Sequence, residues 1–383
     1  MTKLDELIQE LCPDGVEYKE LQEILTIKNG SDYKHLSKGD IPVYGSGGIM
    51  TYVETFSYDK PSVLIPRKGS IDKLYYVEAP FWNVDTIFYT DIDSTQIKPK
   101  YLFYCLQREH LEQYNTAGGV PSLTQAVLNK VQIPVPPQPV QREIVRILDN
   151  FTELTTELTA ELTAELTARK KQYEFYRDKL LDFAGNTDVK NVPLGDIAKF
   201  VYGYTDKAKE TGSVRFVRIT DISEDGRLNP YDAKYVELTD ESKKYLLKKG
   251  DLLLARTGAT YGKTLYFEED EPAVYASFLI KIILDNSVIK NRYYWHFSKS
   301  SLYWEQAERY VSKGGQQQFN TNAVSRVIVP IPSLEVQDRI IYVLDNFDAI
   351  CTDLSSGLPA EIEARQKQYE YYRDKLLSFE EKI

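Results

Sequence analysis

Two segments, one in each half of the chain, combine a strand-like run with a basic turn that contains glycine. The first is Pro61–Ile71 (PSVLIPRKGSI) and the second is Asp251–Lys263 (DLLLARTGATYGK). An arginine in such a turn can donate two hydrogen bonds to guanine, and a nearby glycine lets the backbone approach phosphate. Each segment taken alone fits an ordinary hairpin turn with a surface arginine equally well. The candidate DNA-contacting residues here are Arg67, Lys68, Gly69, Lys73, Arg256, Thr257, Gly258, Tyr261 and Lys263.

A second pair of polar segments lies before the long predicted helices. These segments are Asn115–Thr124 (NTAGGVPSLT) and Ser312–Asn322 (SKGGQQQFNTN). Glutamine and asparagine side chains can bond adenine through a donor and an acceptor. The alternative is a flexible loop that caps the next helix. The candidate DNA-contacting residues in the second segment are Lys313, Gln316, Gln317, Gln318 and Asn320.

Two short stretches resemble catalytic motifs but depart from them. Gly258–Thr264 (GATYGKT) has three residues between its glycines where a phosphate-binding loop needs four, and a strand-like run follows instead of a helix. Pro13–Lys19 (PDGVEYK) is similar to a nuclease carboxylate motif, but its two acidic residues lie only three apart on a short turn. We therefore expect neither a nucleotide site nor a nuclease site.

The remaining residues that could do chemistry are isolated. The chain has no Gly-rich dinucleotide fingerprint and no Asp/Asn-Pro-Pro-Tyr/Phe methyltransferase tetrapeptide. Its histidines and cysteines lack the spacing of metal ligands or of a disulfide framework. They are His35, His110, His296, Cys12, Cys105 and Cys351. We predict no catalytic, cofactor-binding or metal-binding residue, and the absence of a signal-peptide pattern and of a long apolar run favours a reducing, cytoplasmic setting.

The elements that must position these segments occur twice. Val135–Phe151 (VPPQPVQREIVRILDNF) matches Ile331–Phe347 (IPSLEVQDRIIYVLDNF) at an offset of 196 residues. Lys171–Leu181 (KQYEFYRDKLL) matches Lys367–Leu377 (KQYEYYRDKLL) at the same offset without a gap. Each half therefore has a variable region with short strand-like runs, followed by a nearly identical helical region. This pattern predicts a tandem duplication of a complete unit.

The helical regions are typical of long packed helices. Residues 140–183 contain no proline or glycine and could form a helix about 66 Å long, with a four-residue ELTA repeat as its middle part. The second helical region is interrupted at Gly357–Pro359, where proline should kink or restart the helix. We expect the two regions to form an antiparallel coiled coil that acts as a spacer. Its predicted packing residues are Leu148, Phe151, Leu158, Leu162, Leu166, Leu344 and Phe347.

The charge of the chain argues at first against a nucleic-acid binder. The chain has 47 Lys and Arg against 57 Asp and Glu, a net charge of −10, and it has no basic tail. DNA contact must therefore come from positive groups gathered on one face of a mixed surface. The duplicated architecture outweighs the net charge in our interpretation.

The paired helical blocks, together with the opening LIQELCPDGVEYKEL, resemble the specificity subunit of type I restriction–modification systems over nearly the whole chain. The resemblance implies an α+β fold with two target-recognition domains of mixed sheet plus helices, and a pseudo-twofold duplication. The expected boundaries are 1–139 for the first recognition domain, 140–184 for the first helical region, 185–335 for the second recognition domain and 336–383 for the second helical region.

The resemblance also implies partners and chemistry outside this chain. Each recognition domain would read one half of a bipartite DNA site, and the helices would set the gap between the halves. Two methyltransferase subunits would bring S-adenosylmethionine, and motor–nuclease subunits would use ATP and Mg for cleavage, while this chain would hold no cofactor and act as no enzyme. The partner-binding candidates are Tyr173, Tyr176, Arg177, Tyr369, Tyr372 and Arg373. The alternative is a standalone duplicated DNA-binding or scaffold protein outside restriction.

Overall fold

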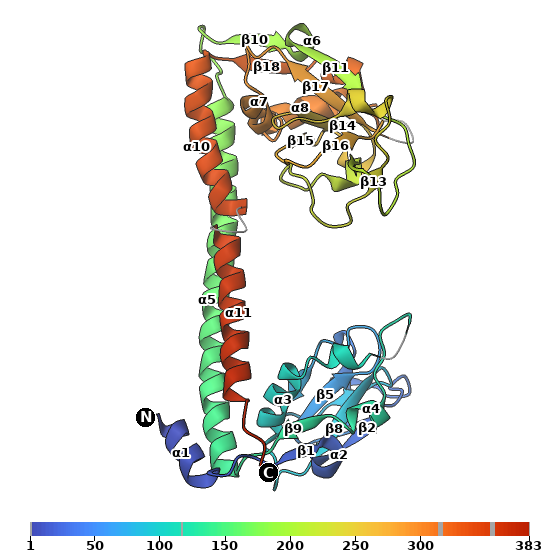
Figure 1. The fold of residues 1–383 in the computed structure, drawn as a ribbon, viewed down its shortest axis with the longest axis vertical. Helices are drawn as coiled ribbons and strands as arrows, with labels where there is room; N and C mark the ends of the chain where they lie inside the picture. Colours follow the sequence, from blue (N-terminus) through green and yellow to red (C-terminus); the bar gives the residue numbers. More distant parts are fainter. Residues whose placement is uncertain (1, 116–117, 313–316, 353–356, 383) are drawn as a thin grey trace. The chain divides into compact units, whose positions relative to one another are not determined.

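The computed structural model describes residues 2–115, 118–312, 317–352 and 357–382 (Figure 1). The chain divides into two compact units. Met1–Glu161 and Ile362–Ile383 form the first unit, and Leu162–Glu361 forms the second. The first unit is therefore built from two distant stretches of the sequence, whereas the second is continuous.

The first unit contains two larger sheets and one two-stranded pair among its described residues. One has the strand order β2 (Leu25–Asn29), β8 (Ile87–Ile92), β5 (Ser62–Pro66), β6 (Tyr75–Val77) and is antiparallel throughout. The other has the order β4 (Gly48–Val53), β3 (Lys38–Gly45), β7 (Trp82–Asn83), with β3 and β7 parallel. Every residue of β5 is buried, as expected for a strand in the interior of a sheet.

Short elements complete the first recognition domain. The strand β1 (Tyr18–Glu20) pairs with β9 (Gln132–Pro134) in antiparallel fashion, and this pair brings the start of the domain to its end. The helices are α1 (Lys3–Leu11), α2 (Leu21–Ile24), α3 (Pro99–Arg108) and α4 (Gln125–Leu128), and Leu111–Tyr114 forms a 3₁₀ turn.

The second unit repeats this plan. Its four-stranded sheet has the order β11 (Ala198–Tyr202), β17 (Leu279–Leu284), β14 (Leu252–Ala255), β15 (Thr264–Tyr266). Its three-stranded sheet has the order β13 (Tyr235–Val236), β12 (Val214–Val217), β16 (Ala273–Tyr275), again with one parallel pair, β12 and β16. The predicted α+β fold with two mixed-sheet domains is confirmed.

The second recognition domain closes in the same way as the first. The strand β10 (Lys190–Pro193) pairs with β18 (Ile328–Ile331) in antiparallel fashion. The helices are α6 (Leu194–Ile197), α7 (Asn291–Phe297), α8 (Ser301–Tyr310) and α9 (Thr321–Val324), and 3₁₀ turns lie at Ile219–Asp221, Ser242–Tyr245 and Gly258–Thr260. The strand after Gly258–Thr260 is β15, as the sequence predicted for this stretch.

The helical regions form an antiparallel pair within each unit. The helix α5 (Gln138–Leu181) has 44 residues. Its first part packs against α11 (Leu358–Leu376), where the rings of Phe151 and Tyr372 lie 5.8 Å apart and the hydroxyls of Thr152 and Tyr369 are 3.0 Å apart. Its last part packs against α10 (Leu334–Thr352), where the ring of Tyr176 stacks on that of Phe347 at 5.5 Å (Figure 1).

The predicted interruption is also present, because α10 ends at Thr352 and α11 begins at Leu358 with Pro359 in its first turn. Ser333 caps α10, since its hydroxyl accepts from the Val336 amide at 3.4 Å. The predicted packing residues differ in depth. Leu148 and Leu344 are fully buried, Phe151 is exposed by 38%, and the remaining four are half-buried, namely Leu158, Leu162, Leu166 and Phe347.

The two ends of the first unit meet. The Val16 amide donates to the Glu380 carbonyl at 2.8 Å, and the Lys382 amide donates to the Val16 carbonyl at 3.0 Å. Leu377 is completely buried in the same core as residues of the first recognition domain. Within the described part of the chain, the helices are too short or too polar to cross a membrane.

Candidate nucleic-acid interface

The two predicted segments of the first recognition domain lie side by side. Arg67 directly follows β5, and its carbonyl accepts from the Leu123 amide at 2.9 Å. The Gly69 amide donates to the Pro121 carbonyl at 3.0 Å, and Lys68 pairs with Ser122 as an isolated antiparallel bridge. Gly69 has a φ of +80°, a conformation that favours glycine. Backbone hydrogen bonds thus join the arginine turn to the segment at 115–124.

The second recognition domain makes the same connection. Arg256 directly follows β14, and its carbonyl accepts from the Phe319 amide at 2.7 Å. The Gly258 amide and the Thr257 hydroxyl both donate to the Gln317 carbonyl, at 3.3 and 3.2 Å. Contacts between segments about 60 residues apart therefore recur in both domains. The repeat makes the arginine turn with its neighbouring segment the candidate interface in each unit.

The individual candidates differ in accessibility. Thr257 is only 3% exposed and joins the two segments, so its hydroxyl is not presented to a ligand. Asn320 accepts from the Ala323 amide at 3.1 Å and caps α9, which matches the alternative interpretation of this segment. Lys313 and Gln316 lie outside the described residues. Lys68, Gly69, Lys73, Gln317 and Gln318 are exposed, and Arg67, Arg256 and Gly258 are half-buried.

Tyr261 and Lys263 are engaged inside their own domain. The ring of Tyr261 packs edge-on against Trp304 at 6.1 Å. The ammonium of Lys263 forms an ion pair with Glu224 at 2.6 Å, and its side chain is largely buried. Glu224 belongs to the long connection between β12 and β13, and no sequence pattern predicts that this connection lies near Lys263.

Two buried glutamines position the recognition domains on their helices, and our sequence reasoning did not single them out. The Gln141 amide oxygen accepts from the Lys98 amide at 2.8 Å, and its nitrogen donates to the carbonyls of Gln96 and Pro136. Gln337 makes the same three kinds of bond, accepting from Lys290 at 2.9 Å and donating to Val288 and Pro332. The sequence contains a signal that could have identified them, because each glutamine follows a valine at the same position of the repeated block.

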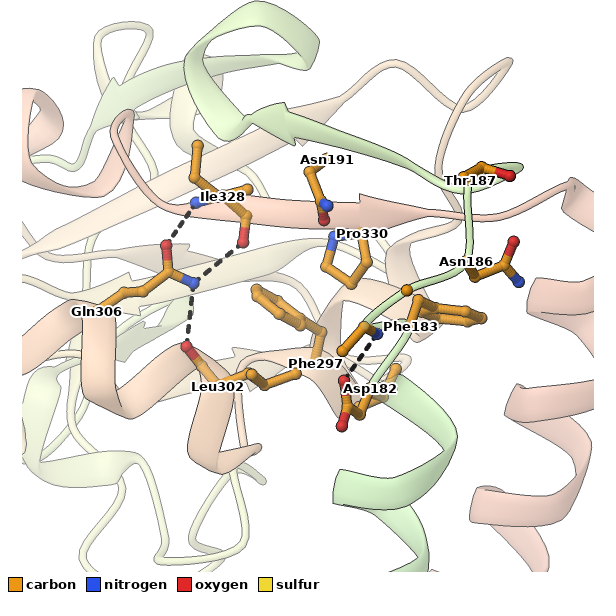
Figure 2. A pocket seen from close by; sticks show the side chains of 13 residues that line it. Asp182, Phe183, Asn186, Thr187, Asn191, Phe297, Leu302, Gln306, Ile328 and Pro330 are labelled. Atoms are coloured by element: carbon orange, nitrogen blue, oxygen red, sulfur yellow. Dashed lines mark hydrogen bonds between the residues drawn. The ribbon is translucent and has the colours of Figure 1, made fainter.

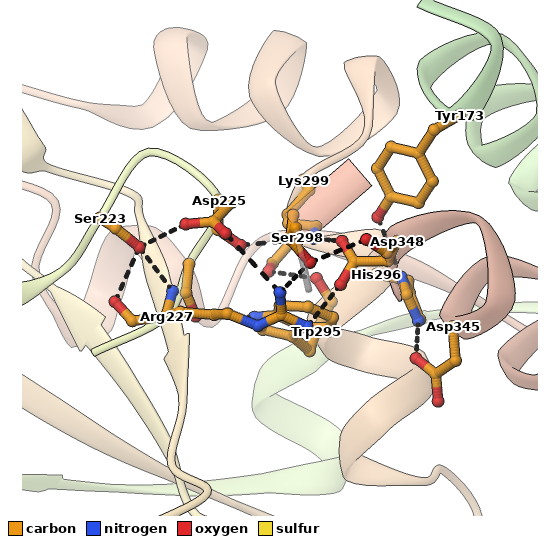
Figure 3. Close-up of polar contacts among 12 residues, drawn as sticks. Tyr173, Ser223, Asp225, Arg227, Trp295, His296, Ser298, Lys299, Asp345 and Asp348 are labelled. Atoms are coloured by element: carbon orange, nitrogen blue, oxygen red, sulfur yellow. Dashed lines mark hydrogen bonds and ion pairs between the residues drawn. The ribbon is translucent and has the colours of Figure 1, made fainter. Parts of the chain in front are cut away.

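A polar cluster joins the second recognition domain to α10 (Figure 3). Asp348 accepts from Arg227 at 2.6 Å and from Lys299 at 3.1 Å, and its side chain is almost completely buried. The ammonium of Lys299 also lies 3.6 Å from the centre of the Trp295 ring. Burial lowers the pKa of Lys299 to about 8, although the Asp348 carboxylate opposes the shift.

The same cluster holds a buried histidine. His296 contacts Asp345 at 2.8 Å through Nε2 and the Tyr173 hydroxyl at 3.1 Å through Nδ1 (Figure 3). Because a carboxylate only accepts, Nε2 carries the proton and Nδ1 accepts from Tyr173. Burial lowers the pKa of His296 to about 4, and the hydrogen bond to Asp345 opposes the shift. The imidazole is therefore neutral at pH 7 and serves as a structural contact.

The first unit has a simpler polar contact between its recognition domain and its long helix α5. Asp149, which aligns with Asp345 in the repeat, accepts from Lys100 at 3.0 Å and from the Tyr104 hydroxyl at 2.6 Å. Thr152 stands where the second unit has Asp348, so the first unit lacks the aspartate that binds two cations.

The partner-binding candidates fall into two groups. Tyr173, Arg177 and Arg373 are buried within their units, and each arginine pairs with the aspartate that follows it. Tyr369 is half-buried. Tyr176 and Tyr372 keep exposed edges, and the preceding residues, Phe175 and Tyr371, are the most exposed described aromatic residues of α5 and α11. We call these four side chains the aromatic edge: Phe175, Tyr176, Tyr371 and Tyr372.

The hollow in Figure 2 offers little to a ligand. It lies in the second unit, encloses about 460 Å³, and is lined by residues that follow α5 together with Phe297, Leu302 and Pro330. One of its polar side chains, Gln306, is already engaged, because it bonds the backbone of Ile328 and Leu302. Among the described residues, there is also no group of three or more His, Cys, Asp or Glu side chains that could hold a metal ion.

Comparisons with known proteins agree with the duplicated plan. The family model of the type I restriction modification DNA specificity domain matches residues 13–168 and 186–364. A Haemophilus influenzae protein that carries the name of a type I restriction enzyme specificity subunit is 34% identical over 385 residues, covering 95% of this chain and 96% of that protein. The specificity subunit of the type I restriction enzyme EcoR124I/EcoR124II of Escherichia coli is 32% identical over 305 residues, covering 76% of this chain and 73% of that protein.

The fold is shared with a solved structure. A chain from a type I R-M system, described for its complex assembly and conformational transition, covers 96% of this chain and 98% of its own length. Its TM-score is 0.68 at 15% sequence identity. At that identity the likeness concerns the fold alone.

Proposed function

Because this chain belongs to the family of type I restriction–modification DNA specificity subunits, we propose that each of its recognition domains reads one half of a bipartite DNA site. The observation that best supports this proposal is a structural repeat. In each unit an arginine turn, after β5 in the first and after β14 in the second, is hydrogen-bonded to a polar segment. The family match favours this interpretation over a standalone DNA-binding or scaffold protein.

The chemistry belongs to partner subunits in this proposal. Two methyltransferase subunits bring S-adenosylmethionine and flip out the target adenine for N6 methylation. Motor–nuclease subunits use ATP and Mg for translocation and cleavage. This chain supplies recognition alone, with no catalytic residue and no cofactor of its own, and the whole complex acts on DNA in the cytoplasm.

The helices set the gap between half-sites, and their exposed aromatic edge offers a surface for the methyltransferase subunits. Aromatic side chains are enriched in protein interfaces because they bury a large area with few rotatable bonds. Phe175 and Tyr371 occupy the same place in the two repeats, which fits one methyltransferase subunit on each copy of the surface. The net charge of −10 predicts weak DNA affinity until those subunits add their own contacts.

Single-molecule methylation sequencing tests the proposal. The chain is co-expressed with the methyltransferase gene that neighbours its own, in cells otherwise free of adenine methylation. Methyladenine confined to one split motif with a fixed gap supports the proposal and identifies both half-sites. Absence of new methylation, with both proteins soluble and associated, contradicts it.

A further inference from the structure

Arg256 lies close to two exposed aromatic rings. Its guanidinium carbon is 5.3 Å from the centre of the Tyr202 ring and 5.5 Å from that of Phe278. Tyr202 ends β11, and Phe278 directly precedes β17. The two side chains are 41% and 51% exposed, so part of each ring faces solvent beside the guanidinium. We call Tyr202 and Phe278 the ring clamp of Arg256.

Hydrogen bonds restrict Arg256 further. Its Nε donates to the Ser277 carbonyl at 3.1 Å, and its backbone amide donates to the Phe278 carbonyl at 3.1 Å. The Tyr202 hydroxyl lies 3.3 Å from the hydroxyl of Thr321, near the end of the polar segment Ser312–Asn322. The side chain is therefore tied at Nε and contacted by two rings, which restricts its rotamer freedom before any ligand binds.

The end of the guanidinium remains available. Within the described residues, neither Nη atom of Arg256 has a hydrogen-bond or ion-pair partner. Two adjacent N–H groups held in one plane match the O6 and N7 acceptors of guanine in the major groove. A half-exposed phenyl ring beside them suits the apolar contacts that a neighbouring base offers, such as a thymine methyl group.

We propose that Tyr202 and Phe278 are specificity-determining residues of the second recognition domain. Both rings orient Arg256 for a guanine in the second half-site, and Phe278 also contacts the adjacent base pair. This inference rests on the proposed function and adds to it the identity of one base and two residues outside the predicted segments.

The first recognition domain provides an internal comparison. Arg67 also follows its strand, but the only aromatic ring near its guanidinium among the described residues is that of Phe88, at 5.7 Å. Asn29 ends β2 and Thr86 directly precedes β8, so the positions of both clamp rings are occupied by polar side chains. Arg67 therefore lacks the clamp, and it is a matched control in the same molecule.

The experiment is methylation sequencing of the complete complex with four variants, each compared with the unchanged chain. Arg256→Lys keeps the charge but loses the paired donors, and we expect guanine preference at one position of the second half-site to fall roughly 5- to 150-fold. Phe278→Leu keeps apolar volume without a ring, and Tyr202→Leu removes the other ring. We expect each to lower the same preference roughly 2- to 5-fold. Arg67→Lys should alter only the first half-site.

The outcomes separate this inference from the proposed function. If the unchanged chain directs methylation to a split motif whose second half contains no G·C pair, the inference is wrong and the proposed function stands. The inference is also wrong, and the proposed function also stands, if Arg256→Lys leaves the guanine preference of the second half-site unchanged. Unchanged preference in both leucine variants has the same meaning. If the unchanged complex methylates no split motif, both are wrong. Retained complex formation and an unchanged half-site for the other recognition domain show that a variant has folded.

Discussion

Replacing Asp348 with asparagine should destabilise the second unit, because the Asp348 carboxylate holds two cations at a buried position. It bonds Arg227 and Lys299 while its own side chain is almost completely buried. Breaking a buried ion pair by removing one partner costs about 3–5 kcal/mol. Arg227 reaches solvent over more than a quarter of its side chain and can recover part of its hydration, so we expect the lower end, about 3 kcal/mol. For a unit of this size that corresponds to a melting temperature about 6–12 °C lower.

Differential scanning calorimetry of the purified chain at pH 7 measures this shift. The control is Asp338→Asn on the same helix, since Asp338 is exposed and pairs with Lys290 at the surface. Exposed ion pairs contribute about 0–1 kcal/mol, so this variant should melt within about 4 °C of the unchanged chain. Hydrogen exchange should locate the extra opening of Asp348→Asn in α7 and in the connection that carries Arg227. A melting shift no larger than that of the control would refute the reasoning, and the cluster would then contribute little to stability.

Further predictions concern His296, Gln337, the length of α5 and the aromatic edge. Burial lowers the pKa of His296 to about 4, against 6.5 for an ordinary histidine, so the unfolded chain binds more protons than the folded chain between these pH values. The free energy of unfolding should therefore fall as the pH drops from about 6.5 to 4. In urea titrations, His296→Gln should reduce this pH dependence. Gln337→Ala leaves one buried amide and two carbonyls without their partner and should cost about 2–3 kcal/mol in urea unfolding. A loss below about 0.5 kcal/mol would count against its role in positioning the second recognition domain on α10. Deleting Ala160–Thr163 removes about 6 Å of α5 and should shorten the gap in the methylated motif while leaving both half-sites unchanged; a new half-site sequence would contradict the spacer role. Replacing both Phe175 and Tyr371 with aspartate should weaken methyltransferase binding at least about tenfold in titrations without lowering the melting temperature, and undiminished binding would place that interface elsewhere.

The long helices and the duplication could be predicted from sequence because their signals are local or repeated. An uninterrupted run without proline or glycine predicts α5, and Pro359 predicts the start of α11 within one residue. The strands that deliver Arg67 and Arg256 were also predicted, since each is a continuous apolar run that ends at a basic turn. Patterns of this kind depend on residues close together in the chain.

The contacts of individual side chains could not be predicted in the same way. Lys263 follows the arginine turn, but its ammonium is neutralised by Glu224 from a connection that one sequence cannot place. Arg256 gains its clamp from Tyr202 at the end of β11 and from Phe278 just before β17. These pairings depend on which strands become neighbours in the sheet, and that order is set by packing of the whole domain.

The composition of the first unit has a consequence for the order of folding during synthesis. Its core includes Leu377, and Arg108 donates to the Leu377 carbonyl at 2.7 Å, so it needs residues made after the entire second unit. Translation at about 5–20 residues per second takes roughly 10–40 s to produce the intervening stretch Leu162–Glu361. The second unit is continuous and can close during this time, while the first recognition domain waits on the ribosome with an unfinished core. The part of the chain that is made first is thus completed last, and in this interval it is the part most exposed to chaperones and proteases.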